Sequence, residues 1–583
     1  MRLIEIRLLE GPNLYRLEPT VKIEVAVGRR RTWYGRRDPA AHAVVRLGAP
    51  VRPADAPPPV RGLAAWSRRL LRLTGTRAGR GPGERLPVTI HRTSEPGGWV
   101  VALPWREHER AAALAETAWR LAEADRDPSI PLRSSPALRR TVRRLRGLHG
   151  AGPSWLTDAQ RRIPIASITG TNGKTTTTRM LSHILRGAGR RVGTTTSDGV
   201  LLDERLVEPG DWTGPGGARQ VLERGEIEVA VLETARGGIL LRGLGYESND
   251  VAIVTNISSD HLDLQGIHTL PELAEVKAVV ARVTRPQGTV VLAADDPLVL
   301  AVAGQVRARV ALWTVAGRPP AAVRRHLAGG GRGRAYLVEA GWLVEAEGSA
   351  RRPIVAVAEV PATLLGLARH NVANALAAAA GARALGCSVE EVAAGLRDFR
   401  AVTEQAPGRL NLYRLGERIV IVDFAHNEAG LEALLEVAAG IAGGAAGRAR
   451  PVTAIVGTAG DRPDDTLRGI GRIAAQLADR VVIKETLHYL RGRTRASYIG
   501  ELQAGLREGG ATADAPVFES EPAALRAALA GGPGPAVIAL MCHEDREAVE
   551  AALAEAGARP IADEQDLLDL LPRLQPRPLR LRG

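Results

Sequence analysis

Short apolar runs alternate with helix-compatible stretches through most of this chain, and the alternation starts twice. Between residues 160 and 360, strands are predicted at 163–169, 227–233, 250–255, 289–293 and 309–314. From 412 to 575, they are predicted at 418–423, 452–456, 480–483 and 536–541. Strands that alternate with helices indicate a mostly parallel, doubly wound sheet. We therefore expect two α/β units, the second of them Rossmann-like.

The segments around these two units follow other patterns. Residues 1–155 predict strands at the start of the chain, 21–27, 86–92 and 98–103, then a helix at 106–124, hence a small α+β domain. Residues 49–83 are rich in proline, arginine and glycine and are expected to form a long loop or a poorly ordered segment. Short β segments are expected at 318–360 and helices at 369–385 and 389–399. The predicted domains are 1–155, 156–405 and 406–583.

Composition limits the possible classes of protein. The chain has 583 residues, 45% of them hydrophobic, which is too long for one core and apolar enough for several. Its two cysteines, Cys387 and Cys542, are far apart, so neither a disulfide framework nor a zinc site is predicted. No signal peptide follows Met1, and no apolar run reaches the roughly 18 residues of a membrane span. We expect a cytoplasmic protein without membrane contact and a disordered tail at 572–583.

The net charge of +14 is carried almost entirely by arginine. Basic residues are scattered and no patch of stacking aromatics accompanies them, so nucleic-acid binding is not expected. The chain has only four lysines, which are Lys22, Lys174, Lys277 and Lys484. Because lysine and arginine differ in chemistry, a lysine retained against this bias suggests a task that arginine cannot perform.

The stretch 163–178, IPIASITGTNGKTTTT, combines a strand, a glycine turn and a helix start. This geometry binds phosphate, because glycines allow close approach and a helix N-terminus offers unpaired N–H groups and a positive dipole end. Lys174 would reach the outer phosphates, and the hydroxyl of Thr175 or Thr176 would hold Mg²⁺. Ile168 replaces the first glycine of the strict Walker pattern. The predicted phosphate site comprises Gly170, Thr171, Asn172, Gly173, Lys174, Thr175 and Thr176.

Three further side chains of the same unit are candidates for the site; two follow strands and one lies on a helix. Glu233 ends a strand, where a carboxylate suits a metal ion; the alternative is a cap for the next helix. His261, in TNISSDHLD, is a candidate ligand for a second divalent metal ion, with Asp260 or Asp263 in support, although a lone histidine is more often structural. Lys277 lies on the next helix, where a lysine is normally solvated.

The loop TGTNGKT and the segment TNISSDHLD resemble motifs of the Mur ligase superfamily, the ATP-dependent amide ligases. The resemblance implies ATP and two Mg²⁺ ions as cofactors, with Thr175, Glu233, His261 and Lys277 as metal ligands. It implies that Lys277 takes up CO₂ to become a carbamate, an anion that can hold Mg²⁺. Lys174, Glu233, His261 and Lys277 would form the catalytic set.

The resemblance also implies a nucleotide pocket. ARHNVANALAAA matches HN-x-x-N-x-x-A, in which His370 and Asn371 line the nucleotide; a polar helix start is the alternative. Arg409 resembles the hinge arginine that reaches the phosphates. IVDFAHNEAG resembles DYAHNP and adds Asp423 and His426, with Glu428 in place of the proline. Ala293 stands where the family has the asparagine that faces adenine, so nucleotide preference stays open.

Further blocks resemble the Mur-like half of the cyanophycin synthetase family, namely TTTSDGV, EPGDWTGPGGAR, LETARGGIL, KETLHYLRGR and MCHEDRE. The amino-terminal segment MRLIEIRLLEGPN resembles that family's first domain. Residues 134–162 lead directly into the phosphate loop, so the ATP-grasp module of that family is expected to be absent. The chain is predicted to join an amino acid to a peptide or amino-acid carboxylate, either alone or with a separate ATP-grasp ligase. The alternative is a non-catalytic nucleotide-binding subunit of such a ligase. Homo-oligomerisation is left open.

Overall fold

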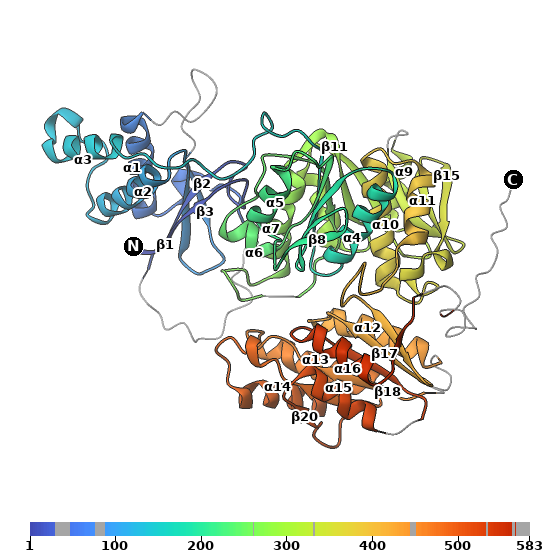
Figure 1. Cartoon of the computed structure of the whole chain (residues 1–583). Helices are drawn as coiled ribbons and strands as arrows, with labels where there is room; N and C mark the ends of the chain where they lie inside the picture. The colour runs from blue at the N-terminus through green and yellow to red at the C-terminus, as the bar shows by residue number, and fades with distance from the viewer. Residues whose placement is uncertain are drawn as a thin grey trace.

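Three sheets organise the chain in the computed structural model (Figure 1). The structure describes residues 1–28, 47–75, 88–259, 262–329, 333–443, 450–531, 534–562 and 566. The predicted tail at 572–583 lies outside these residues. None of the described helices is long and apolar enough to cross a bilayer. The predicted α/β class, with a mostly parallel central sheet, is confirmed.

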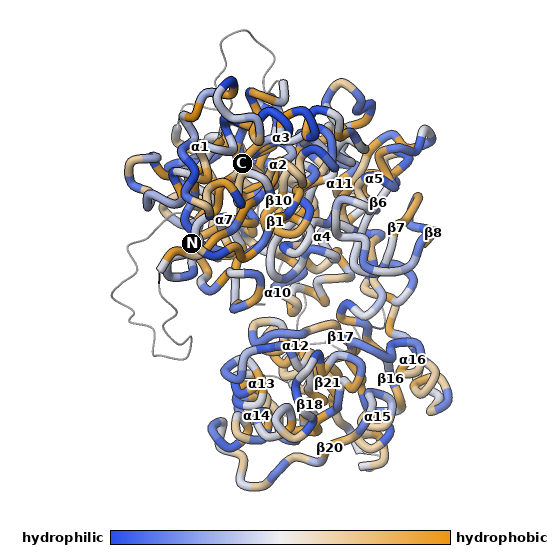
Figure 2. The backbone as a smooth tube through the Cα atoms, turned by 90° about the vertical axis from the view of Figure 1, so that its left-hand side faces the viewer, coloured by the Kyte–Doolittle hydropathy of each residue, from blue (hydrophilic) through white to orange (hydrophobic). Residues whose placement is uncertain are grey.

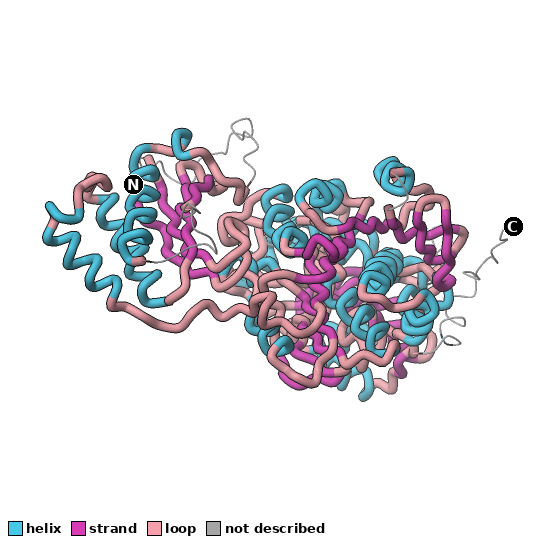
Figure 3. The backbone as a smooth tube through the Cα atoms, turned by 90° about the horizontal axis from the view of Figure 1, so that it is seen from above, coloured by secondary structure: helices cyan, strands magenta, loops and turns pink. Residues whose placement is uncertain are grey.

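The N-terminal sheet has four antiparallel strands in the order β1-β2-β4-β3. Its strands are β1 (Arg2–Leu9), β2 (Thr20–Ala26), β3 (Thr89–Arg92) and β4 (Gly98–Pro104). Helices α1 (Pro58–Thr74), α2 (His108–Glu123) and α3 (Pro136–Arg146) pack with it around one apolar core. Figure 3 shows the helices at the outer end and the strands toward the centre of the molecule.

The prediction of a long loop or poorly ordered segment at 49–83 is wrong for residues 58–74, because these residues form α1. Val60, Leu63, Leu70 and Leu71 are buried at helical spacing, and prolines occupy the first turn, where no N–H is needed. Residues 76–83 of the same segment lie outside the described part of the chain.

The central sheet has eleven strands in the order β15-β14-β13-β12-β11-β10-β5-β9-β6-β7-β8. The strands from β6 through β13 in this order run parallel, with antiparallel hairpins at both edges. Their bounds are β5 (Ile165–Thr169), β6 (Val192–Thr195), β7 (Gly199–Leu202), β8 (Arg205–Pro209), β9 (Val229–Glu233), β10 (Asn249–Val254), β11 (Thr284–Ala293), β12 (Arg309–Thr314), β13 (Arg334–Glu339), β14 (Trp342–Glu347) and β15 (Ala350–Ala356).

Helices cover both faces of this sheet. They are α4 (Lys174–Gly187), α5 (Pro215–Leu222), α6 (Arg236–Leu241), α7 (Leu270–Arg282), α8 (Pro297–Ala301), α9 (Ala321–Ala328), α10 (Arg369–Ala384) and α11 (Val389–Asp398). Helix α9 falls where only β segments were expected, because buried Val323 and Leu327 give it a small apolar face. Residues 330–332 of the expected glycine-rich turn are not among the described residues.

The C-terminal sheet has seven strands in the order β20-β19-β18-β21-β17-β16-β22. They are β16 (Asn411–Leu415), β17 (Arg418–Asp423), β18 (Val452–Val456), β19 (Arg480–Lys484), β20 (Val517–Phe518), β21 (Val537–Met541) and β22 (Arg559–Pro560). Its helices are α12 (Glu428–Ile441), α13 (Asp464–Leu477), α14 (Arg495–Glu508), α15 (Glu521–Ala530) and α16 (Arg546–Glu555). Figure 2 shows the apolar strands β18 and β21 between these helices.

Candidate active site

Two glycines of the loop between β5 and α4 have no room for a side chain. Gly170 has φ +153°, and a Cβ there would lie 1.8 Å from Thr255 Oγ1. Gly173 has φ +81°, and its Cβ would lie 2.3 Å from Asn374 Oδ1. Gly173 is also the N-cap of α4 and provides no side-chain cap, so the first N–H groups of the helix remain available to an anion. The predicted arrangement of strand, glycine turn and helix start is observed, and phosphate binding at it stays a prediction.

The segment after β10 holds this loop in place. Thr255 Oγ1 donates a hydrogen bond to Asn172 O at 2.7 Å, and Asn256 Nδ2 donates to the same oxygen at 3.0 Å. Asn256 Oδ1 accepts from Asn172 N at 2.9 Å. Thr171 Oγ1 and Ser258 N are 3.1 Å apart. The first residues of TNISSDHLD therefore shape the loop.

Both predicted lysines meet at the loop from different elements. Lys174 Nζ donates to Thr171 O at 2.8 Å, so its side chain lies across the loop. Lys277, from α7, is only 4% exposed, and its Nζ donates to Gly170 O at 2.5 Å. The solvated position normal for a helical lysine is thus not observed. The carbamate on Lys277 stays a prediction.

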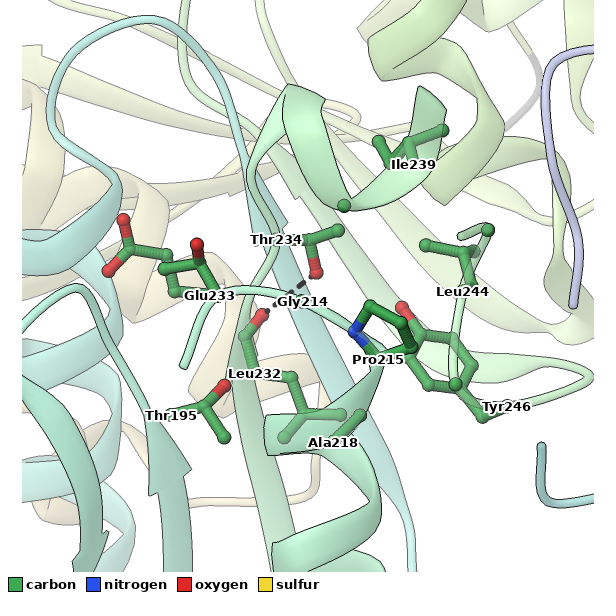
Figure 4. Close-up of a pocket in the computed structure, with 14 residues that line it drawn as sticks. Thr195, Gly214, Pro215, Ala218, Leu232, Glu233, Thr234, Ile239, Leu244 and Tyr246 are labelled. Atoms are coloured by element: carbon green, nitrogen blue, oxygen red, sulfur yellow. Dashed lines mark hydrogen bonds between the residues drawn. The ribbon is translucent and has the colours of Figure 1, made fainter. Parts of the chain in front are cut away.

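Glu233 ends β9 with its carboxylate buried, and Figure 4 shows it turned away from Tyr246 and Leu244. Its Oε2 has no hydrogen-bond partner among the described residues. Burial raises the pKa of Glu233, while Lys174 and Arg409 oppose the rise. Helix α6 begins without any side-chain cap, so the capping alternative is not observed. A buried carboxylate oxygen without a donor fits a divalent cation.

The other predicted metal ligands do not form a cluster among the described residues. His261 and Asp260 lie outside the described residues. Asp263 Oδ1 is 2.6 Å from His268 Nδ1. Among residues that the structure describes, no group of three or more His, Cys, Asp or Glu side chains could hold a metal ion. Thr175, Glu233, His261 and Lys277 remain the predicted ligand set.

Arg409 reaches the phosphate loop from the start of the C-terminal unit. Its Nη2 lies 3.4 Å from Thr175 Oγ1 and 3.3 Å from Ser197 Oγ, and its guanidinium lies 4.4 Å from the centroid of the Phe424 ring. Although burial opposes it, the pKa of Asp198 is lowered by Arg409 and other arginines. Ser197 and Asp198 belong to TTTSDGV, yet nothing in that motif predicted their contact with residue 409.

The Asp423–Asn427 segment brings the C-terminal unit to the same loop. Asn427 and Asn172 exchange side-chain hydrogen bonds of 3.2 and 3.0 Å. Asp423 Oδ2 accepts from Leu410 N at 2.8 Å, and burial raises the pKa of Asp423 against the attraction of Arg409. His426 Nδ1 lies 3.0 Å from Phe424 O. The phosphate loop therefore lies between the central and C-terminal sheets.

The residues of α10 that are predicted to bind the nucleotide lie next to helix α4, which follows the loop. Asn371 Nδ2 donates to Ala362 O at 2.8 Å, and its Oδ1 accepts from Asn374 Nδ2 at 3.1 Å. Asn374 Oδ1 in turn accepts from Thr177 Oγ1 at 3.2 Å, which ties α10 to α4. Burial lowers the pKa of His370 to about 4, so its ring is neutral. Contact of His370 and Asn371 with a nucleotide remains a prediction.

Comparisons with known proteins support the resemblance. The Mur ligase middle domain model matches residues 168–382, and the model for the Mur ligase glutamate ligase domain matches 408–560. The cyanophycin synthetase of Crocosphaera subtropica is 44% identical over 338 residues, which are 58% of this chain and 38% of that protein. The chain thus spans less than half the length of this relative.

Alignments with two further proteins cover more of the other protein's length. The UDP-N-acetylmuramyl-tripeptide synthetase of Deinococcus radiodurans is 30% identical over 372 residues, which are 60% of this chain and 67% of that protein. A bifunctional folylpolyglutamate synthase/dihydrofolate synthase, solved with Mn, AMPPNP and L-glutamate bound, shares the fold with a TM-score of 0.50 and 21% identity. That alignment covers 68% of this chain and 89% of the other. From its phosphate loop, its sheets and these matches, the chain belongs to the Mur ligase family.

Proposed function

We propose that this protein is an ATP-dependent amide ligase. A substrate carboxylate attacks the γ-phosphorus of ATP, so that a C–O–P linkage forms while the bond to ADP breaks. An amine then attacks the acyl carbon, loses a proton and displaces phosphate. The products are an amide, ADP and phosphate. The observation that carries this proposal is the loop of residues 170–173, in which Gly170 and Gly173 leave no room for a side chain, followed by Lys174 at the start of α4, in a member of this family.

Different side chains would neutralise phosphate charge, hold the metal ions and exclude water. Lys174 and Arg409 carry positive charge to the loop, where the transferring phosphoryl group accumulates negative charge; such preorganised charge is a main source of rate enhancement. Glu233 and Thr175 fit one divalent cation. His261 would hold a second, and Lys277, once carbamylated, would be a further Mg²⁺ ligand. Magnesium would neutralise phosphate charge. Closure of the C-terminal unit over Asn172 would exclude water from the activated acyl group.

The substrates are proposed by class. The shared blocks with cyanophycin synthetase favour an amino acid as the amine and a peptide or amino-acid carboxylate as the acceptor. A separate ATP-grasp ligase is the proposed partner that would supply such a peptide. Ala293 favours the second candidate, a nucleotide-binding subunit without turnover.

A phosphate-release screen separates these proposals. Amino acids and short peptides are tested in pairs with Mg-ATP, and polyaspartate with arginine is one of the pairs. Release is expected only when a carboxylate and an amine are both present, and Lys174→Ala is expected to abolish it. Release that Lys174→Ala leaves unchanged would contradict the ligase. Binding of Mg-ATP without release for any pair would favour the non-catalytic subunit.

A further inference from the structure

A fully buried ion pair lies at the carboxyl end of the C-terminal sheet, and the reaction proposed above does not use it. Lys484 ends β19 with its side chain 0% exposed, and its Nζ donates to Glu521 Oε1 at 2.6 Å. Burial raises the pKa of Glu521, but the attraction of Lys484 prevails and holds the pKa below its ordinary value. A buried charge pair is costly to desolvate and does not by itself stabilise a fold. Its presence calls for another role.

The third member of this cluster is His543. Its Nδ1 lies 2.7 Å from Lys484 Nζ, and its Nε2 lies 2.7 Å from Ala425 O. An ammonium group can only donate, so Nδ1 accepts, and the ring proton resides on Nε2, which donates to the Ala425 carbonyl. Burial, together with Lys484, holds the pKa of His543 well below its usual range. The lysine therefore fixes one tautomer of a neutral histidine.

The hydrogen bond to Ala425 leads to the phosphate loop. Ala425 follows Phe424, whose ring meets the His543 ring edge-on at a centroid distance of 5.1 Å. The guanidinium of Arg409 lies over the same Phe424 ring, and Arg409 reaches Thr175. His543 thus contacts the Phe424 ring edge-on, while the Arg409 guanidinium lies over the face of that ring.

We propose that Lys484, Glu521 and His543 form a positioning network that holds Phe424 beneath Arg409 and so aims Arg409 at the phosphates. The inference rests on the proposed function, since it requires a nucleotide at the phosphate loop. The hydrogen bonds and ion pairs described for Lys484, Glu521 and His543 do not include any with residues 170–173. Nucleotide affinity should therefore depend on side chains that act only through Phe424 and Arg409.

Two substitutions of His543 separate its two hydrogen bonds. His543→Asn places an acceptor near Nδ1, which keeps Lys484 satisfied but loses the donor to Ala425. His543→Gln places an amide N–H near Nε2, which keeps that donor. Calorimetry with Mg-ATP measures the effect. His543→Asn is expected to raise the Kd about tenfold, the loss expected when the charged hydrogen bond from Arg409 to a phosphate is misplaced. His543→Gln is expected to raise it by less than about twofold. Equal Kd values for wild type and His543→Asn would overturn the network.

A double-mutant cycle with Arg409→Ala tests the route. In the Arg409→Ala background, His543→Asn is expected to change the Kd by less than about twofold, because the residue through which it acts is gone. A further tenfold loss in that background would overturn the proposal. Thermal unfolding of each variant controls for misfolding, since a purely structural role would lower the melting temperature and leave the Kd unchanged. Failure of the wild type to bind Mg-ATP would instead contradict the proposed function.

Discussion

At the scale of single residues, Gly170 and Gly173 give the phosphate loop its shape. Both have a positive φ, and a side chain at either would collide with Thr255 or Asn374. Thr255 directly follows β10 and Asn374 lies in α10, so the loop is enclosed by segments distant in sequence. The two glycines and these close neighbours therefore fix the course of the loop into α4, whose first N–H groups are available to an anion.

Gly170→Ala is expected to lower the free energy of unfolding by about 2 kcal/mol, because strain and overpacking act together. Mg-ATP binding should be lost with it. Gly187→Ala is the control, since Gly187 is the last residue of α4, the helix that follows the loop, and has nothing within 4 Å of an added Cβ. That control should be neutral or stabilising by up to about 1 kcal/mol. Urea unfolding and calorimetry measure both quantities, and equal effects of the two changes would contradict the geometry.

The sequence predicts residues that belong to one local motif better than residues that meet in space. Strand, glycine turn and lysine are contiguous, so Gly170, Gly173 and Lys174 could be predicted as a phosphate site. Ser197 and the partnership of Asn172 with Asn427 could not, because hydrogen bonds between distant segments leave no periodic pattern. Lys484 was marked by its rarity and as the first residue of KETLHYLRGR, but its partners appear only in the folded chain.

At the scale of elements, buried strands were the most predictable part. The strands Arg309–Thr314, Arg418–Asp423 and Val452–Val456 match their predicted bounds, because short apolar runs between turns have few alternatives. Helix α1 was missed, since its many arginines and prolines obscured the amphipathic spacing. The β7–β8 hairpin was also missed, and all residues of β8 are exposed, so no apolar run marked it.

Helix α4 carries a pH-dependent contact as well as the phosphate loop. His183 Nδ1 lies 2.6 Å from Glu204 and its Nε2 lies 3.0 Å from Asp398. Burial lowers the pKa of His183, but the two carboxylates prevail and raise it. A folded-state pKa above the unfolded value means that this contribution to stability is complete below about pH 6.5 and is lost as pH rises through the folded pKa.

His183→Gln is therefore expected to cost about 1 kcal/mol of unfolding free energy at pH 6 and less at pH 9. Urea unfolding of both proteins at the two pH values measures the difference. A cost that is the same at pH 6 and pH 9 would show that protonated His183 does not contribute.

At the scale of the whole molecule, the N-terminal unit is docked on the central one. Glu10 N donates to Arg242 O at 2.7 Å, and Leu244 N donates to Pro12 O at 2.8 Å. A Cβ on Gly11 would lie 1.8 Å from Leu244 O. The GPN turn of the amino-terminal motif is thus a docking element, a role that the sequence alone did not indicate.

Gly11→Ala is expected to loosen this contact and to raise the rate of limited proteolysis between the two units several-fold, roughly as a loss of 1 kcal/mol would. Gly62→Ala, in the middle of α1 with nothing within 4 Å, is the control and should not change the rate. Unchanged cleavage of Gly11→Ala would mean that the units are held together elsewhere.

The central claim is that Mg-ATP binds at the loop of residues 170–173. Isothermal titration calorimetry of the wild type and Lys174→Ala tests it most directly. The wild type should bind Mg-ATP at one site, and Lys174→Ala should bind at least about tenfold more weakly, because a charge-assisted contact to phosphate is lost. No binding by the wild type, or equal binding by the two proteins, would contradict the account.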